Sequence, residues 1–268
     1  MAGGNMETVK EQYDNIIEWL TEIKVEGCNG VVLGLSGGKD STVVAMLAKE
    51  VWGENVLALL MPNGKQIDID DSIHIAETIH LDYRIVNIET IFNALTNVVE
   101  NKIAPNKKGE LDYCENCPKI TAKAKTNIPP RIRMTVLYAV AQSIGYRVIG
   151  TGNASEAYIG WTTKWGDSAY DFNPIAHLTC TQVIELGKYL AAKHGLDEKY
   201  ITKVPSDGLC GKTDEESFGF SYKELDEWIS HENKDTNKHA LDLDAKIETM
   251  HLRSEHKRRM PLTMLNKL

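Results

Sequence analysis

Short apolar runs alternate with amphipathic segments along much of the chain. Four of these runs predict strands that are buried on both faces, as in a parallel sheet: 30–35, 56–61, 84–88 and 147–151. Apolar residues at helical spacing predict helices over the following ranges: 7–23, 41–51, 70–79, 91–101, 130–144, 181–194, 222–230 and 237–251. This alternation is typical of a doubly wound α/β fold, in which right-handed crossovers place helices on both faces of a parallel sheet.

Two internal segments and the end of the chain depart from this pattern. Residues 104–127 and 204–220 are rich in charge, Gly and Pro, so we expect two long loops there. A basic tail, 253–259, follows the last predicted helix. No internal repeat or low-complexity linker interrupts the chain, and we therefore expect residues 1–268 to form a single domain.

Composition narrows the class of protein. Hydrophobic residues make up 42% of the chain and charged residues 25%, an ordinary globular mixture that excludes a fibrous protein or a disulfide scaffold. The formal net charge of −8 argues against nucleic acid as a partner. No apolar stretch is long enough to cross a membrane and the first residues do not form a signal peptide, so we expect a cytoplasmic protein with five reduced cysteines.

The strongest local signal, residues 36–41 (Ser-Gly-Gly-Lys-Asp-Ser), lies where the first predicted strand meets the next helix. Gly37 and Gly38 allow a tight turn close to a ligand, and the free N–H groups of the helix favour an anion. The alternative is a plain strand-to-helix turn in which Asp40 or Ser41 caps the helix. Two glycines, two hydroxyls and a carboxylate exceed what a cap requires, and the spacing differs from that of a Walker A loop. We therefore predict a phosphate site.

This segment resembles the pyrophosphate loop of the N-type ATP pyrophosphatases, which split ATP between the α and β phosphates. Later motifs resemble one member of that group, the ammonia-dependent NAD synthetase family. The motifs follow in chain order: Arg131–Met134, Gly150–Glu156, Gly160–Asp167, Asp171, Pro174, Pro205–Asp207, Lys212–Glu215 and Glu255–Arg258. The resemblance runs from about Leu33 to Pro261, which is nearly the whole chain.

The resemblance implies a fold and a reaction. The fold would be a doubly wound, five-stranded parallel sheet flanked by helices, of the adenine-nucleotide α-hydrolase type. In the reaction, ATP would adenylate the carboxyl of deamido-NAD and release pyrophosphate, and ammonia would then displace AMP to give NAD. Glutamine-dependent relatives carry an additional amidase domain, for which 268 residues leave no room, so we expect free ammonia, or ammonia from a partner, as the nitrogen source.

The resemblance also implies roles for residues that match the motifs. Asp40 and Glu156 would hold Mg²⁺, which prefers oxygen ligands, and together with Lys164 they would be the catalytic residues. The residues implied to contact ATP, the co-substrate, are Gly34, Leu35, Ser36, Gly37, Gly38, Lys39, Asp40, Ser41, Thr151, Cys180 and Ser206. Those implied to hold deamido-NAD, at the interface of a homodimer, are Arg131, Lys164, Asp171, His256 and Lys257.

Cys180 departs from the family pattern, because the family usually has there a lysine that contacts ATP. Lys39, Lys203 or Lys212 are the candidates to supply the missing charge. Taken alone, Glu156 is also compatible with a surface acid, and the basic residues from His256 onward are compatible with a solvated tail.

Two other functions stay open from the sequence. Cys114 and Cys117 form a Cys-x-x-Cys pair that the NAD synthetase family does not require, and beside the same phosphate loop it is compatible with a tRNA-thiolating relative. We interpret the pair as two reduced thiols, with a redox or partial metal site as the alternative, since no second pair exists to complete a zinc site. A nucleotide-binding regulatory module that does no chemistry is the third hypothesis.

Overall fold

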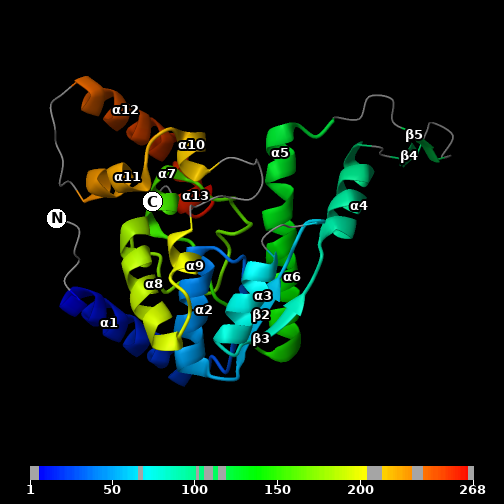
Figure 1. Ribbon diagram of the computed structural model, residues 1–268. Helices are drawn as coiled ribbons and strands as arrows, with labels where there is room; N and C mark the ends of the chain where they lie inside the picture. Colours follow the sequence, from blue (N-terminus) through cyan, green and yellow to red (C-terminus); the bar gives the residue numbers. More distant parts are fainter. Residues whose placement is uncertain are drawn as a thin grey trace.

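The computed structural model describes residues 6–65, 69–100, 103–105, 111–113, 119–203, 213–230 and 238–264. Its centre is a parallel sheet with the strand order β3 (Asp82–Ile85), β2 (Val56–Leu60), β1 (Val31–Gly34) and β6 (Arg147–Val148). The predicted α/β class is confirmed (Figure 1). The expected count of five strands in this sheet is wrong for the described residues, in which the parallel sheet has four. Beyond β6 the sheet continues only as a single parallel bridge from Ile149 to Phe172.

Alternate residues of β1 point to opposite faces of the sheet, and each face has its own core. Val31 and Leu33 pack into the first core and Val32 into the second. The helices of the first core are α1 (Met6–Val25), α2 (Lys39–Trp52), α3 (Ile69–Thr78), α8 (Cys180–His194) and α9 (Lys199–Thr202). Those of the second are α4 (Glu89–Glu100) and α6 (Ile128–Ile144). The central strand is thus covered on both sides, which explains its continuous apolar run.

A third core joins the short helices that follow the sheet, grouped at one end of the molecule in Figure 1. Its centre is Phe218, whose ring lies 4.7 Å from that of Phe220 and 5.3 Å from that of Tyr222. The helices of this core are α7 (Ala154–Ile159), α10 (Asp214–Phe218), α11 (Tyr222–Ile229) and α12 (Lys238–Arg253), and α13 (Glu255–Arg258) lies beside them. This core packs against the first turn of α8 through Cys180.

Several predicted boundaries and loops differ in the structure. The strand expected over 84–88 is β3, which begins at Asp82 and ends at Ile85. Beyond Ile85, single backbone hydrogen bonds from Val86 and Ile88 extend the pairing with the chain of β2 and the residues after it. The predicted loops contain short elements, which are β4 (Ile103–Pro105), β5 (Leu111–Tyr113), α5 (Ala122–Thr126) and α10. Elements of three to five residues are too short to show an apolar period.

The basic tail predicted over 253–259 is instead the last residue of α12 followed by α13, which packs on α7. Arg258 donates from Nη1 to the carbonyls of Ala157 at 3.1 Å and Tyr158 at 2.9 Å. Cys114, Cys117 and Ser206 lie outside the described residues. No helix within the described ranges is long and apolar enough to cross a membrane.

Candidate active site

The predicted phosphate loop joins β1 to α2 and is shaped by its own hydroxyl groups. Ser41 Oγ accepts from the backbone N–H of Ser36 at 3.2 Å and donates to the carbonyl of Gly38 at 3.1 Å. Gly37 has a φ of +80°, and a Cβ built there would lie 2.9 Å from Ser72 Oγ. A larger residue at this position would clash with the start of α3, so the loop needs glycine.

Gly38 is the N-cap of α2, and no side chain of the described chain bonds to the helix start as a cap. The alternative interpretation, in which Asp40 or Ser41 acts as the cap, is therefore wrong. The first N–H groups of α2 remain available to an anion, with the favourable dipole of the helix behind them. The predicted loop residues, 34–41, thus run from the last residue of β1 through the turn into the start of α2, at the carboxyl end of the central strand, where open α/β sheets bind ligands.

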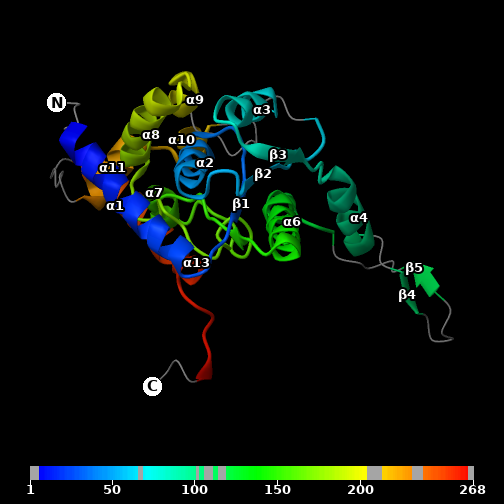
Figure 2. The same cartoon turned by 90° about the horizontal axis from the view of Figure 1, so that it is seen from below.

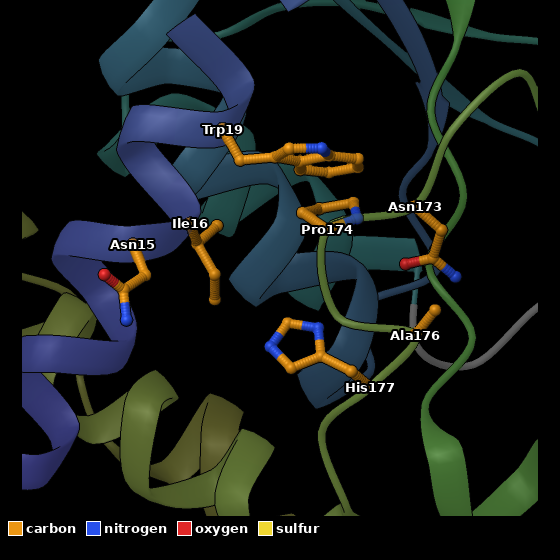
Figure 3. Close-up of a pocket in the computed structure, with 7 residues that line it drawn as sticks. All are labelled: Asn15, Ile16, Trp19, Asn173, Pro174, Ala176 and His177. Atoms are coloured by element: carbon orange, nitrogen blue, oxygen red, sulfur yellow. The ribbon is translucent and has the colours of Figure 1, made fainter. Parts of the chain in front are cut away.

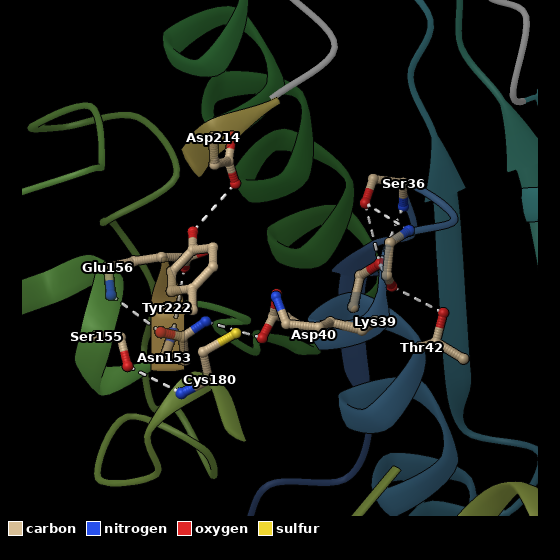
Figure 4. A network of polar contacts seen from close by, with 12 residues as sticks. Ser36, Lys39, Asp40, Thr42, Asn153, Ser155, Glu156, Cys180, Asp214 and Tyr222 are labelled. Carbon is tan, nitrogen blue, oxygen red and sulfur yellow. Dashed lines mark hydrogen bonds and ion pairs between the residues drawn. The ribbon is translucent and has the colours of Figure 1, made fainter. Parts of the chain in front are cut away.

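Asp40 and Glu156 come from different elements, and Asn153 connects them (Figure 4). Asn153 Nδ2 donates to Asp40 Oδ1 at 3.0 Å, while Asn153 Oδ1 accepts from the backbone N–H of Glu156 at 3.0 Å. Glu156 Oε2 accepts in return from the N–H of Asn153 at 3.4 Å, which completes a capping box at the start of α7. Asn153 had no predicted role, although Asn followed three residues later by Glu is the sequence signal of this cap. Thr151 lies two residues before it, between β6 and α7.

The two carboxylates are half-buried and share a negatively charged environment. Burial, and next the charge of Asp40, raise the pKa of Glu156 well above its ordinary value. Burial alone would lower the pKa of Lys39, but the negative groups around it, Asp40 foremost, raise it overall. Lys39 therefore stays charged, and the pair of carboxylates favours a cation beside it.

Cys180 lies in the first turn of α8, buried against α7 and α11. Burial raises the pKa of its thiol to about 12, so the side chain is neutral at physiological pH. Its backbone N–H donates to Ser155 Oγ at 2.8 Å, and Ser155 in turn donates to Asp226 Oδ1. Asp226 Oδ2 also accepts from the N–H of Thr181 at 2.7 Å. Asp226, for which the sequence gives no signal, thus fixes the start of α8 relative to α7.

Four of the five residues predicted to hold the substrate come together from three elements. Arg131 Nε on α6 donates to the carbonyl of Lys164 at 3.2 Å, and Lys164 Nζ donates to the carbonyl of His256 on α13. Lys257 Nζ donates to the carbonyls of Gly160 and Thr162 at 2.7 and 2.6 Å. Burial lowers the pKa of Lys257; the charge of Asp167 opposes this effect, and those of Lys123 and Arg131 add to it. Lys164 and Lys257 are half-buried and Arg131 is exposed, and such a group of cations favours an anionic ligand.

Asp171, the fifth predicted substrate residue, makes its hydrogen bonds elsewhere. Its Oδ2 accepts from the backbone N–H of Val148 in β6 at 2.7 Å, and its Oδ1 accepts from Tyr138 Oη at 3.3 Å. In this structure Asp171 therefore supports the edge of the sheet. Its predicted contact with substrate stays a prediction.

Gly160 is where the chain leaves α7 and meets the residues before α13. It has a φ of +71°, and a Cβ built there would lie 2.1 Å from Ser254 Cβ. We expect Gly160→Ala to lower the free energy of unfolding by about 3 kcal/mol, because the backbone is strained and the segment that carries Lys257 must shift. Urea unfolding measures the loss.

Gly145 provides a matched control for this substitution. It follows α6 with the same φ of +71°, but a Cβ there would meet no atom within 4 Å. Gly145→Ala should therefore lose only about 1 kcal/mol, the contribution of the left-handed conformation. Equal losses in the two variants would show that the contact with Ser254 has no effect.

A cavity of about 270 Å³ lies apart from these residues, between α1 and residues 173–177 (Figure 3). Trp19, Pro174 and His177 are among the side chains that line it. It contains none of the residues predicted for the site. We therefore assign it no part in the chemistry.

Fold and site together define a nucleotide-binding α/β protein, with a phosphate loop at the end of its central strand and paired carboxylates beside it. The profile of the NAD synthase family matches residues 12–261, and the chain belongs to that family. This confirms the family predicted from the motifs.

Named relatives extend over nearly the whole chain. The NH(3)-dependent NAD(+) synthetase of Carboxydothermus hydrogenoformans is 38% identical over 94% of this chain and 96% of its own. Among solved structures, the NMN synthetase of Francisella tularensis is 34% identical, with a TM-score of 0.79 over 95% of this chain and 98% of that one. The NH3-dependent NAD synthetase of Campylobacter jejuni is 29% identical, with a TM-score of 0.73 over 96% and 98% of the two chains.

Proposed function

We propose that this chain catalyses the ATP-dependent amidation of deamido-NAD by ammonia, giving NAD, AMP and pyrophosphate. The observation that carries the proposal is α7, which is six residues long. Its first turn holds Glu156 near Asp40 and the phosphate loop, and the carbonyls at its end bind Arg258 and Lys257. One short helix thus connects a phosphate site to a cationic site, as a reaction between two anionic substrates requires. Similarity to proteins named NH(3)-dependent NAD(+) synthetase supports this reaction.

The proposed reaction has two steps. In the first, a carboxylate oxygen of deamido-NAD bonds to the α-phosphorus of ATP while the bond from that phosphorus to the bridging oxygen breaks, and pyrophosphate leaves. In the second, ammonia bonds to the carbonyl carbon, the bond to AMP breaks, and one proton is released. No side chain needs to act as a nucleophile. The protein has to bring two anions together and stabilise the departing pyrophosphate.

The roles of the residues follow from this requirement. The N–H groups of the loop, 34–41, are assigned to the phosphates of ATP, with Thr151 and Cys180 beside them and Ser206 from outside the described residues. Arg131, Lys164 and the α13 residues His256 and Lys257 are assigned to the anionic groups of deamido-NAD, together with Asp171. Lys164 is also proposed to be catalytic because its ammonium can neutralise the substrate as it approaches ATP.

Mg²⁺ is the proposed cofactor, held by Asp40 and Glu156. Within the described ranges no group of three or more His, Cys, Asp or Glu residues is arranged to hold a metal. A pair suits Mg²⁺, which binds through one or two carboxylates when phosphates and water complete its shell. The raised pKa of Glu156, caused by burial and by Asp40, is what a cation at this place would reverse. When bound, Mg²⁺ would neutralise charge on the phosphates.

The test is a direct assay of product. The folded chain with deamido-NAD, MgATP and ammonium should form NAD and AMP in equal amounts, and glutamine in place of ammonium should give no product. Because the similar Francisella protein is an NMN synthetase, the second candidate substrate is nicotinate mononucleotide, and the ratio of the two kcat/KM values decides between them. No amide from either substrate would contradict the proposal.

The same assay separates the two other hypotheses. Replacing Cys114 and Cys117 by serine should leave amidation unchanged, whereas tRNA thiolation would require sulfur at these positions. A regulatory module would bind ATP without releasing pyrophosphate.

A homodimer is the proposed assembly, with residues 1–268 as one domain in the cytoplasm. Helix α4 extends away from the rest of the molecule in Figure 2 and carries exposed apolar side chains on successive turns. They are Ile91, Leu95, Val98 and Val99. Such a patch is typical of a surface that another protein covers, and a second copy is the occupant the family resemblance implies.

Sedimentation measures the assembly. We expect twice the chain mass of 29.9 kDa, and Leu95→Asp should lower it to that of one chain. A wild-type protein that stays monomeric at micromolar concentration would exclude the dimer.

A further inference from the structure

Lys39, the first residue of α2, points inward instead of toward solvent. Its side chain is only 4% exposed, and Nζ lies 2.8 Å from Asp40 Oδ2 and 5.3 Å from the centre of the Tyr222 ring. In Figure 4 the Lys39 side chain extends from α2 toward Cys180 at the start of α8. Lysine at a helix start usually extends its charged end into water, so its burial here needs a compensating partner.

The partners are the two carboxylates assigned to the metal. Asp40 Oδ2 binds the ammonium, while Asp40 Oδ1 accepts from Asn153. Glu156 is close enough to act on Lys39 electrostatically. Lys39 is thus the counterion of Asp40 in the free protein, with Glu156 close by. A divalent cation and this ammonium would compete for Asp40, because like charges repel at such distances.

Lys39 also faces the first turn of α8, where the neutral thiol of Cys180 brings no positive charge. Lys203, another candidate from the sequence, extends to Asp71 at 3.0 Å, and Lys212 lies outside the described residues. Of the two candidates that the structure describes, Lys39 is the one directed toward Cys180.

We propose that Lys39 exchanges partners during the reaction. In the free enzyme its ammonium neutralises Asp40, and when metal-bound ATP enters, it leaves Asp40 and donates to the phosphates that depart as pyrophosphate. In both states the ammonium then balances negative charge in the site. The exchange also gives the phosphates a cation from α2, since Cys180 at the start of α8 provides none. This inference rests on the proposed function, and it assigns to the Lys39 side chain a role distinct from that of the loop N–H groups.

The first test is Lys39→Met, with Lys49→Met as the matched control. Lys49 lies near the other end of α2, where it binds Glu54 and the carbonyl of His80. In Lys39→Met, Mn²⁺ alone should bind about tenfold more tightly, because its competitor is gone, while the KM for ATP should rise by about tenfold or more. Electron paramagnetic resonance of free Mn²⁺ measures the first effect without any turnover. Lys49→Met should change neither quantity.

The second test moves the charge to the facing helix. Adding Cys180→Lys to Lys39→Met should return the KM for ATP to within about threefold of wild type, since an ammonium again reaches the same space. If Lys39→Met alone does not fold, the double variant is measured in its place. A double variant that does not recover both folding and ATP binding overturns the proposal.

The outcomes separate this inference from the proposed function. If the wild type shows no turnover, the proposed function is excluded. Mn²⁺ binding by wild type and by Lys39→Met still tests the competition for Asp40. Wild-type turnover together with unchanged or weaker Mn²⁺ binding in Lys39→Met, or with an unchanged KM for ATP, would overturn the exchange of partners.

Discussion

Asp40→Asn is expected to lower kcat/KM by about 10³-fold while the protein stays folded. Asparagine preserves the size of the side chain and can still accept from Asn153, so the geometry of the loop is maintained. The negative charge that would bind a metal disappears, and with it the electrostatic contribution to the first step. Initial rates at saturating ammonium measure the effect.

Some loss of stability should accompany this change, because Lys39 loses its nearest counterion. We expect the free energy of unfolding to fall by about 2 kcal/mol, which is far too little to unfold a typical domain at 25 °C. Asp14→Asn is the control, since Asp14 forms an exposed pair with Lys10 on α1. Activity within tenfold of wild type in Asp40→Asn would remove this residue from the proposed metal site.

Glu156→Gln should lower kcat/KM by about 100-fold or more with little change in folding. The amide oxygen of glutamine at this position can still accept from the backbone N–H of Asn153, so the capping box persists. What is lost is a carboxylate beside Asp40. Glu224→Gln is a closely matched control, because Glu224 occupies the same position in the capping box of α11 with Ser221. A similar loss of activity in both variants would attribute the effect to the cap and contradict a role for the charge.

The stability of Glu156→Gln should also depend on pH in a defined direction. The pKa of Glu156 is raised from 4.5 to about 8 by burial and by Asp40, so the folded state favours the protonated form. In metal-free buffer the wild type should therefore lose stability relative to Glu156→Gln as the pH rises from 4.5 to about 8. Thermal unfolding of both proteins across this range measures the difference, and a constant difference would show that Glu156 titrates normally.

Sequence patterns predicted the strands and helices whose apolar residues repeat regularly, and the phosphate loop with its pair of glycines. The first strand, the phosphate loop and α2 follow each other as expected, because apolar runs and glycine pairs act over a few residues. The short helices α7 and α13 were not predicted. Their few residues show no periodicity, and α13 is held by bonds from Arg258 and Lys257 to carbonyls at the end of α7.

The sequence by itself determined the α/β class, the place of the phosphate loop and the family. Only the tertiary structure decided that Asn153 connects Asp40 to Glu156, that Asp226 fixes α8, and that Lys39 points inward. The physical reason is separation along the chain. Asn153 and Asp40 are 113 positions apart and Lys164 and His256 are 92 apart, so no local pattern encodes these contacts. They form only when the cores on the two faces of the sheet and the third core bring the helix ends together.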